Sequence, residues 1–318
     1  VIREKKRTAT GIETAESDFE ITIETSDVIY TFDKLGGTLS SINFRGKELL
    51  DKGPKLNVWW APTDNDYQFG NGIEKKWYGC RLDKLQHYVR DVRLAKADEK
   101  SAVVEISVIV GPPSYYAPFN VAYTYEVFAS GEVELTTDIK IGKINENDTL
   151  PRLAKIGLQM VLAKGSDRLD WYGRGPHESY SDKKESALIA LYGGSVKDQE
   201  EFYVRPQENG NKSDVRWAAV TDMFGKGIFA DSDEVLNISA HKYTDEMLTK
   251  ADHIHELGRI EETVFNIDYK VSGLGSGSCG PETLEKYWVK PKDTCFTVRL
   301  CPFDKNEITP TALHKTEL

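Results

Sequence analysis

The strongest constraint on the fold of this chain is a stretch in which apolar and polar residues alternate. In EVELTTDIKIG, residues 132–142, every second position is apolar or Thr, and the positions between them are mostly charged. Because successive side chains of a β-strand point to opposite faces, this period of two predicts a half-buried strand. Residues 121–131 alternate in the same way, and Ser130-Gly131 is the predicted turn of a hairpin that joins the two strands.

Most of the remaining chain also predicts strands, and helical patterns are few. The two predicted helices cover residues 72–82 and 243–257. In the second, Thr244 is the expected N-cap, and the acidic residues after it suit the positive end of the helix dipole. Strands and helices do not alternate regularly, which argues against a parallel α/β sheet and for an all-β fold. Further predicted strands span residues 18–24, 28–33, 102–110, 264–271 and 295–303.

Composition excludes two classes of partner. Hydrophobic residues make up 39% and charged residues 29% of the 318, as in soluble globular proteins. The net charge of −10 argues against nucleic acid, whose binding depends on Lys and Arg at the phosphates. A membrane partner is not expected, because no segment approaches the roughly 18 consecutive apolar residues of a membrane-spanning helix.

The beginning of the chain predicts a piece of a longer protein. VIREKKRTAT contains neither an initiator Met nor the apolar core of a signal peptide. We expect residues 1–12 to be a linker from a preceding domain, and residues 13–318 to form one large antiparallel β domain. The short segment ENDTLPR, residues 146–152, is a candidate connector between two halves of that domain.

Four cysteines occur, and none has the CxxC spacing of metal or redox sites. Free cysteine behaves as a small hydrophobic residue. The sequence therefore predicts four free, mostly buried thiols. These are Cys80, Cys279, Cys295 and Cys301, of which the last two share one predicted strand.

Four segments interrupt the strands with glycine, proline, charged, amide and aromatic residues. They span residues 59–72, 171–184, 203–217 and 272–281. Carboxylates and amides bind sugar hydroxyls, and aromatic rings stack on sugar C–H surfaces, so this mixture is typical of carbohydrate sites. Glu178 and Glu208 lie in two of these segments. From the residues alone, three roles stay open for them: an acid–base pair, ligand binding, or structural support.

Several short patterns suggest metal or nucleotide chemistry, and each has a plainer interpretation. Asp64-Asn65-Asp66 departs from EF-hand spacing and predicts a turn with Asx hydrogen bonds. His253 and His255 would point apart on the predicted helix, so no metal site is expected. The glycines of 273–277 are not followed by the helix of a dinucleotide loop, and 275–279 does not match a nucleophile elbow.

The four segments resemble, in order, those of a known family. WAPTDND with GNG, WYGRGPHESYSDK, YVRPQENGNKSDVRW and GLGSGSCGP are similar to the C-terminal domain, or small chain, of bacterial β-galactosidases of glycoside hydrolase family 2. Residues 151–160 and 239–248 fit the same pattern, and the resemblance covers about residues 15–303. It implies a β-supersandwich of antiparallel strands like that of galactose mutarotase, in agreement with the predicted strands.

The resemblance also implies where catalysis takes place. In the family, the acid/base and nucleophile glutamates lie in a separate (β/α)8 barrel, so this chain is expected to contain no catalytic residue and to be inactive alone. Its expected partners are that barrel, or a large subunit, and a β-galactoside. No cofactor is expected in this chain, and the Mg that parent enzymes often use would lie in another domain. The compartment stays open between bacterial cytoplasm and periplasm.

One late loop of this family domain contributes to the active-site wall, where a Trp commonly stacks on the sugar. In this chain Cys279 and Gly280 stand at that position, which implies a more open leaving-group side and a β-galactoside other than lactose. Arg174, His177 and Glu178 belong to the family's GRGPHE signature, and we expect hydrogen-bonded scaffolding there. The candidate binding residues are Ser278, Cys279, Gly280, Asp64, Asn65, Arg174, His177, Glu178, Glu208 and Asn209.

Two other functions remain as alternatives to a β-galactosidase domain. The chain could bind galactosides as an independent module in its own cleft. It could also act as an aldose 1-epimerase, with Glu208 as base and His177 or His241 as acid. The second alternative rests on the analogy of fold alone, which is a weak argument for activity.

Overall fold

The alternating stretch forms the predicted hairpin in the interior of a large sheet. β10 (Phe119–Phe128) pairs antiparallel with β11 (Val133–Ile141). Val133, Leu135 and Ile139 of β11 are buried, as the period of two predicts. Gly131 has a φ of +83°, which glycine adopts at little cost, and its N–H donates to the carbonyl of Phe128 at 2.8 Å. The predicted strands and turn are therefore confirmed here.

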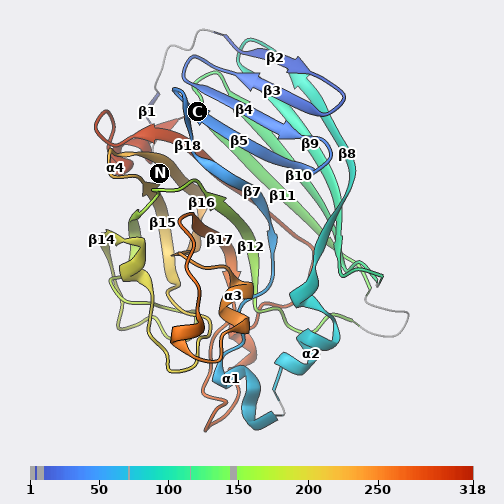
Figure 1. The fold of residues 1–318 in the computed structure, drawn as a ribbon, viewed down its shortest axis with the longest axis vertical. Coiled ribbons are helices and arrows are strands. Elements are labelled where there is room, and N and C mark those ends of the chain that lie inside the picture. The colour runs from blue at the N-terminus through green and yellow to red at the C-terminus, as the bar shows by residue number, and fades with distance from the viewer. Residues whose placement is uncertain (1–3, 6–10, 71, 115, 144–148, 318) are drawn as a thin grey trace.

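The computed structural model describes residues 4–5, 11–70, 72–114, 116–143 and 149–317. The fold is all-β, as predicted, and both main sheets are entirely antiparallel. The larger, twelve-stranded sheet curves through the molecule, and the five-stranded sheet lies across part of it (Figure 1). This arrangement of curved antiparallel sheets is the predicted β-supersandwich.

The larger sheet runs in the order β14-β13-β15-β16-β18-β11-β10-β9-β8, and β17, β12 and β7 branch from β16. Besides β10 and β11, its strands are β7 (Leu50–Asn57), β8 (Gln86–Ala97), β9 (Ser101–Gly111), β12 (Lys155–Leu162), β13 (Arg168–Gly175), β14 (Leu188–Ser195), β15 (Lys212–Thr221), β16 (Lys226–His241), β17 (Thr263–Val271) and β18 (Thr294–Asp304). The smaller sheet contains β2 (Glu13–Glu16), β3 (Glu20–Glu24), β4 (Val28–Asp33), β5 (Thr38–Phe44) and β6 (Lys47–Glu48).

The two sheets enclose the main hydrophobic core. Tyr30 and Phe32 on β4 are completely buried against the hairpin of the larger sheet. The rings of Phe32 and Tyr125 meet edge to face at 5.1 Å between centroids, and the Tyr30 hydroxyl donates to the carbonyl of Gly131. Buried aromatic residues of this size bring large apolar areas into the core, which favours folding.

The predicted helices are present but shorter than expected. α2 covers only Glu74–Gly79 of the predicted 72–82. α3 covers Asp245–Lys250, and Thr244 caps it as predicted by accepting from the N–H of Met247. α3 and α2 lie toward the same end of the molecule as α1 (Asp64–Tyr67), as Figure 1 shows. A further short helix, α4 (Pro310–Leu313), follows β18.

The prediction that His253 and His255 point apart on a helix is wrong. The chain leaves α3 after Lys250, and His253 precedes a single 3₁₀ turn over Ile254–Glu256. The Glu256 carboxylate accepts from the N–H groups of Asp252 and His253, which favours this tight turn over a continued helix. The two imidazole rings then stack at 5.5 Å between centroids.

The cysteine prediction is partly confirmed. All four cysteines lie in the described part of the chain, and none of them forms a disulfide. Cys301 is buried, but Cys279 and Cys295 are exposed, so the expectation of mostly buried thiols is wrong. Among the described residues, no helix has both the length and the apolar character to span a bilayer.

Most of the predicted linker 1–12, and residues 146–148 of the predicted connector, lie outside the described residues. Within the linker range, β1 (Glu4–Lys5) pairs in parallel with β19 (Thr316–Glu317). The division into a linker and one domain stays a prediction.

Candidate functional site

The loop of residues 273–280 is fixed at both of its sides by side chains from other candidate segments. The Asn65 amide donates from Nδ2 to the carbonyl of Gly275, and its Oδ1 accepts from the N–H of Ser278, both at 3.0 Å. On the other side, the Asp182 carboxylate accepts from the N–H groups of Leu274 and Gly275 at 2.9 and 2.7 Å. These four hydrogen bonds anchor the loop, which contains a turn at residues 276–280 but no helix or strand.

Atoms of Asp182 and Asn65 approach the backbone of this loop so closely that two of its positions have no room for a side chain. A Cβ on Gly273 would lie 2.7 Å from the Asp182 carboxyl carbon, and one on Gly277 would lie 2.7 Å from the Asn65 carbonyl oxygen. Sequence reasoning missed Asp182, although it lies in the segment 171–184. The alternating glycines were the available signal, because they indicate that another backbone or side chain approaches closely.

Asp64 and Asn65 lie on α1, which differs from the predicted Asx turn. α1 is a single helical turn, and the Asp66 carboxylate completes it by accepting from the Thr63 N–H and hydroxyl. Burial raises the pKa of Asp66 to about 6. Asp64 instead bonds reciprocally with Gln207: its N–H donates to Gln207 Oε1, and its Oδ2 accepts from Gln207 Nε2. α1 therefore joins the loop 273–280 to the segment 203–217.

Arg174 is a scaffold residue in this structure. Its Nε donates to Asp214 at 2.6 Å, and its Nη1 donates to the carbonyls of Lys184 and Ala187. The Lys184 ammonium contacts the same carboxylate at 2.9 Å. Burial alone would raise the pKa of Asp214, but the hydrogen bonds from Arg174 and Lys184 hold it below its usual value. This charge-assisted network ties β13 to β15.

His177 and Glu178 are neighbours in sequence but have different partners. His177 is exposed, and its Nε2 lies 3.0 Å from the Ser186 hydroxyl. The Glu178 carboxylate accepts from the Tyr203 hydroxyl and from the N–H of Gly210 at 2.8 Å. Glu178 thus connects two candidate segments.

Glu208 and Asn209 lie below the surface. Glu208 is 7% exposed, and its Oε1 accepts from the Tyr180 hydroxyl at 3.2 Å. Burial raises the pKa of Glu208 to about 8, and nearby carboxylates add to this rise while Lys155 opposes it. Asn209 has its whole amide engaged: Nδ2 donates to Gln207 and Tyr243, and Oδ1 accepts from the N–H of Glu201.

A buried cluster of charged side chains lies near Glu208, and it was not predicted from the sequence. Lys155 on β12 is 1% exposed, and its ammonium lies 3.6 Å from Asp268 and 3.8 Å from Asp245. Burial raises the pKa of Asp268 to about 6, against the opposing charge of Lys155. The available signal was a charged residue within an otherwise apolar strand, since such residues are rarely buried without a partner.

His241 belongs to the same buried region. Its Nε2 lies 3.1 Å from the Asn209 carbonyl oxygen, and its ring stacks on Tyr243 at 4.8 Å. Burial lowers the pKa of His241 to about 4, so it is neutral at physiological pH. A neutral imidazole bonded to a backbone carbonyl is poorly suited to act as a general acid.

The geometry thus divides the predicted residues into two groups. Ser278, Cys279 and Gly280 lie in the fixed loop, and Cys279 is exposed. Most of the other candidates hold loops together through hydrogen bonds, and their oxygen atoms are largely used by protein donors. A group of three or more His, Cys, Asp or Glu arranged to hold a metal is absent from the described residues.

Comparison with known proteins gives consistent results. The model of the family described as "Beta galactosidase small chain" matches residues 24–300. The β-galactosidase of Priestia megaterium (strain DSM 319 / IMG 1521) is 32% identical over 261 residues, which are 82% of this chain and 24% of that protein. That of Kluyveromyces lactis is 31% identical over 282 residues, which are 87% of this chain and 26% of that protein. The chain spans about a quarter of the length of these relatives.

Solved structures with a similar fold include a putative mutarotase (YeaD) from Salmonella typhimurium. Its TM-score is 0.46 at 13% identity, covering 95% of this chain and 96% of that one. Galactose 1-epimerase from Lactobacillus acidophilus NCFM has a TM-score of 0.45 at 11% identity, covering 93% and 99%. The sequence comparisons decide the family: because the family model covers most of the chain and β-galactosidases match it at over 30% identity, the chain belongs to the β-galactosidase small-chain family.

Proposed function

We propose that this chain is the C-terminal domain of a retaining β-galactosidase of glycoside hydrolase family 2, in which it completes the wall of the active site and stabilises the enzyme. The acid/base and nucleophile carboxylates would lie in a separate (β/α)8 barrel or large subunit, and any Mg would be bound there too. The observation that carries this proposal is the loop 273–280, which Asn65 and Asp182 fix from two sides. A fixed loop can contribute to a site at low entropic cost.

The candidate carboxylates support a non-hydrolytic role. A retaining glycosidase needs two carboxyl groups about 5–5.5 Å apart that flank the scissile bond. Glu178 accepts from Tyr203 and Gly210, and Glu208 is buried and accepts from Tyr180. These bonds use the carboxylates to hold the candidate segments together.

Exposed apolar side chains support docking against another part of a larger enzyme. Large exposed apolar patches are uncommon on proteins that function alone. On β14, Ile189 is 41% and Leu191 is 60% exposed, and the alternation of a strand places both on one face. At and just before the start of the candidate segment 203–217, Val204 is 90% and Phe202 is 70% exposed. Contact with the catalytic barrel would remove this apolar area from water.

The direct test is an assay with a chromogenic β-galactoside. We expect no turnover by the purified chain, and restored turnover when the remaining part of its enzyme is added. Turnover by the chain alone would overturn the proposal and return attention to Glu178 and Glu208. Failure of a folded chain to restore activity would instead favour an independent galactoside-binding module.

Asn65→Leu should weaken the restored activity roughly thirtyfold. The substitution removes both hydrogen bonds to the loop, at Gly275 and Ser278, and each is worth about 1 kcal/mol. The measurement is kcat/KM of the mixed enzyme. Asn306→Leu is the matched control, because the Asn306 amide also holds a turn, through the Phe224 carbonyl. Equal losses in both variants would contradict a specific role for the loop 273–280.

Cys279→Trp should shift preference toward lactose. Cys279 is exposed in the fixed loop and stands where the family resemblance implies an aromatic residue. A Trp there would add an apolar platform for the leaving-group sugar. We expect KM for lactose to fall severalfold relative to Cys279→Ser in the same mixed enzyme. An unchanged KM would show that position 279 does not face the leaving group.

A further inference from the structure

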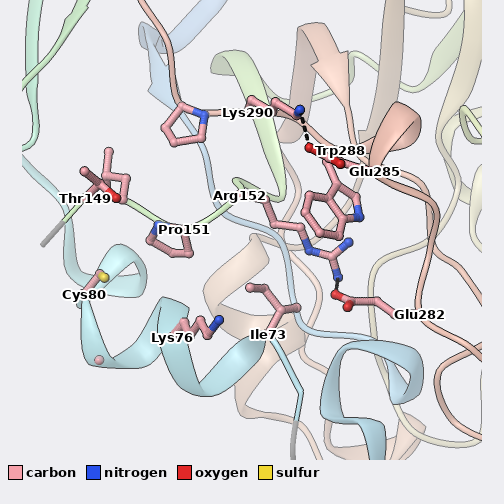
Figure 2. Close-up of a pocket in the computed structure, with 13 residues that line it drawn as sticks. Ile73, Lys76, Cys80, Thr149, Pro151, Arg152, Glu282, Glu285, Trp288 and Lys290 are labelled. Atoms are coloured by element: carbon pink, nitrogen blue, oxygen red, sulfur yellow. Dashed lines mark hydrogen bonds and ion pairs between the residues drawn. The ribbon is translucent and has the colours of Figure 1, made fainter.

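A large groove adjoins the loop 273–280 and is used by none of the functions above. Its first part is a cavity of about 820 Å³ between α2, residues 149–152 and residues 282–291 (Figure 2). A second cavity of about 450 Å³ shares Glu285, Trp288 and Lys290 with the first. We call the two together the Trp288 groove. Its first cavity alone has the size of a pocket for a small ligand.

The Trp288 groove is basic although the whole chain is acidic. Six cations line its two cavities, against the two carboxylates of Glu282 and Glu285. The net charge of the chain is −10. Arg152 pairs with Glu282 and Lys290 with Glu285, and the four remaining cations leave an excess of positive charge that concentrates anionic ligands. The six cations are Lys76, Arg152, Lys270, Lys286, Lys290 and Lys292.

The Arg152 side chain has two hydrogen-bond donors that are not paired within the described part of the chain. Its side chain is 10% exposed and pairs through Nη2 with Glu282 at 2.7 Å. Among the described residues, Arg152 Nε and Nη1 are buried and have no hydrogen-bond partner. Burial lowers the pKa of Arg152, while Glu282 and Asp66 oppose this effect. Donors left unpaired in this way are costly, so an anion that reached them would be bound favourably.

Trp288 supplies the apolar surface of the groove. It is half-buried and borders both cavities. Figure 2 shows the Arg152 guanidinium beside its ring, and the distance from the guanidinium carbon to the ring centroid is 4.9 Å. The Trp288 Nε1 donates to the Thr283 carbonyl at 3.0 Å, which fixes the indole. A fixed indole next to a guanidinium suits a sugar ring that carries an acidic group.

We propose that the Trp288 groove binds an anionic oligosaccharide, one that carries a sulfate or a carboxylate group. The glycan would place its acidic group near Arg152 and the lysines, and a sugar face against Trp288. Glu282, which lines the groove, follows the loop 273–280 in the chain with only Pro281 between them. With that loop at the leaving-group side, as the proposed function has it, the bound glycan is the leaving-group part of an acidic β-galactoside, and this last step rests on the proposed function.

The test is calorimetric titration of the purified chain with four probes. They are a sulfated galactose disaccharide, a digalacturonate, neutral galactobiose and inorganic sulfate. We expect at least one charged disaccharide to bind about tenfold more tightly than both galactobiose and inorganic sulfate, with an affinity that falls as salt rises. Stronger binding of the first or the second probe identifies sulfate or carboxylate as the preferred group. Equal binding of neutral and charged disaccharides, equal binding of inorganic sulfate, or no binding would overturn the proposal.

Variants locate the binding in the groove. Arg152→Gln and Trp288→Leu should each weaken the charged disaccharide about tenfold. Lys197→Met, in a different cavity, is the control and should leave the affinity unchanged. If Arg152→Gln fails to fold, the double variant Lys290→Met with Lys292→Met alters only exposed side chains and should weaken binding severalfold. Unchanged affinity in a folded groove variant would contradict the assignment.

The outcome is separable from that of the proposed function. Binding is measured on this chain alone, whereas the proposed function is tested by restored hydrolysis of a neutral chromogenic galactoside. If hydrolysis is restored but the chain binds no charged disaccharide, the groove proposal has failed. If the chain binds the disaccharide but does not restore hydrolysis, the proposed function has failed.

Discussion

Asp231→Asn lowers the free energy of unfolding by about 3–5 kcal/mol, the range for breaking a buried ion pair. Asp231 is completely buried on β16, and Arg299 on β18 is 2% exposed. Two parallel hydrogen bonds join them, from Nε at 2.7 Å and from Nη2 at 2.6 Å. His314 adds a contact from Nδ1 at 2.7 Å. An amide cannot accept from all these donors, so the Arg299 charge loses its closest partner and is left with Glu132, whose Oε2 lies 3.8 Å from Arg299 Nη1.

Three observations test this expectation. The first is the midpoint of urea unfolding, compared with Asp98→Asn, which removes an exposed carboxylate that pairs with Lys96 at 2.7 Å. Exposed pairs contribute little, so that control should change stability only slightly. The second is the double variant Asp231→Asn with Arg299→Met, which removes the stranded Arg299 charge and should recover part of the loss, because the buried Glu132 then lacks this cation. A loss as small as that of the control would contradict the argument.

The third observation is the pH dependence. Burial alone would raise the pKa of Asp231, but the hydrogen bonds from His314 and Arg299 hold it below its usual value. The unfolded chain therefore binds this proton at higher pH than the folded chain does. The ion pair contributes its full stability above the ordinary carboxyl pKa, which applies to the unfolded chain. This contribution is lost as the pH falls through the lower pKa that Asp231 has in the folded chain. The difference between wild type and Asp231→Asn should shrink in acid.

Local patterns predicted the strands well because each depends on neighbouring residues. The alternation in 132–142 required only that one face be buried, and Val133, Leu135 and Ile139 are buried. Helix length was harder to predict, because the end of α3 depends on backbone hydrogen bonds to Glu256. A carboxylate six residues beyond the last helical residue gives no periodic signal.

The contacts that define the candidate site are non-local, and this is why sequence reasoning missed some of them. Asp182 lies 92 residues from Leu274, whose N–H donates to it, and Asn65 lies 213 residues from Ser278. Nothing in the local pattern of either segment identifies its partner. The family resemblance did identify the loop 273–280 and the GRGPHE segment. The matching segments 151–160 and 239–248 contain Lys155 and Asp245, but the pattern does not show that these residues meet Asp268 of β17 in one buried cluster.

Glu208→Gln makes the folded chain more stable at pH 8–9 but changes it little at pH 5. Burial raises the pKa of Glu208 to about 8. Between the ordinary carboxyl pKa and about 8, the folded chain holds a proton that the unfolded chain has released. Wild-type stability therefore falls as the pH rises through this window, by roughly 1.4 kcal/mol for each unit of the pKa rise. Gln mimics the protonated acid and has no such dependence.

The measurement is urea unfolding of wild type and Glu208→Gln at pH 5, 7 and 8.5. Glu99→Gln, at an exposed position, is the matched control and should keep the wild-type pH dependence. A difference that is constant with pH, or in which Gln is the less stable at pH 8.5, would mean that Glu208 is ionised in the folded chain and stabilised by Lys155. In that case Lys155 would outweigh burial, and the buried cluster would be a charged pair network. The expected result shows instead a neutral Glu208 that holds Tyr180 in place and cannot serve as a carboxylate nucleophile at neutral pH.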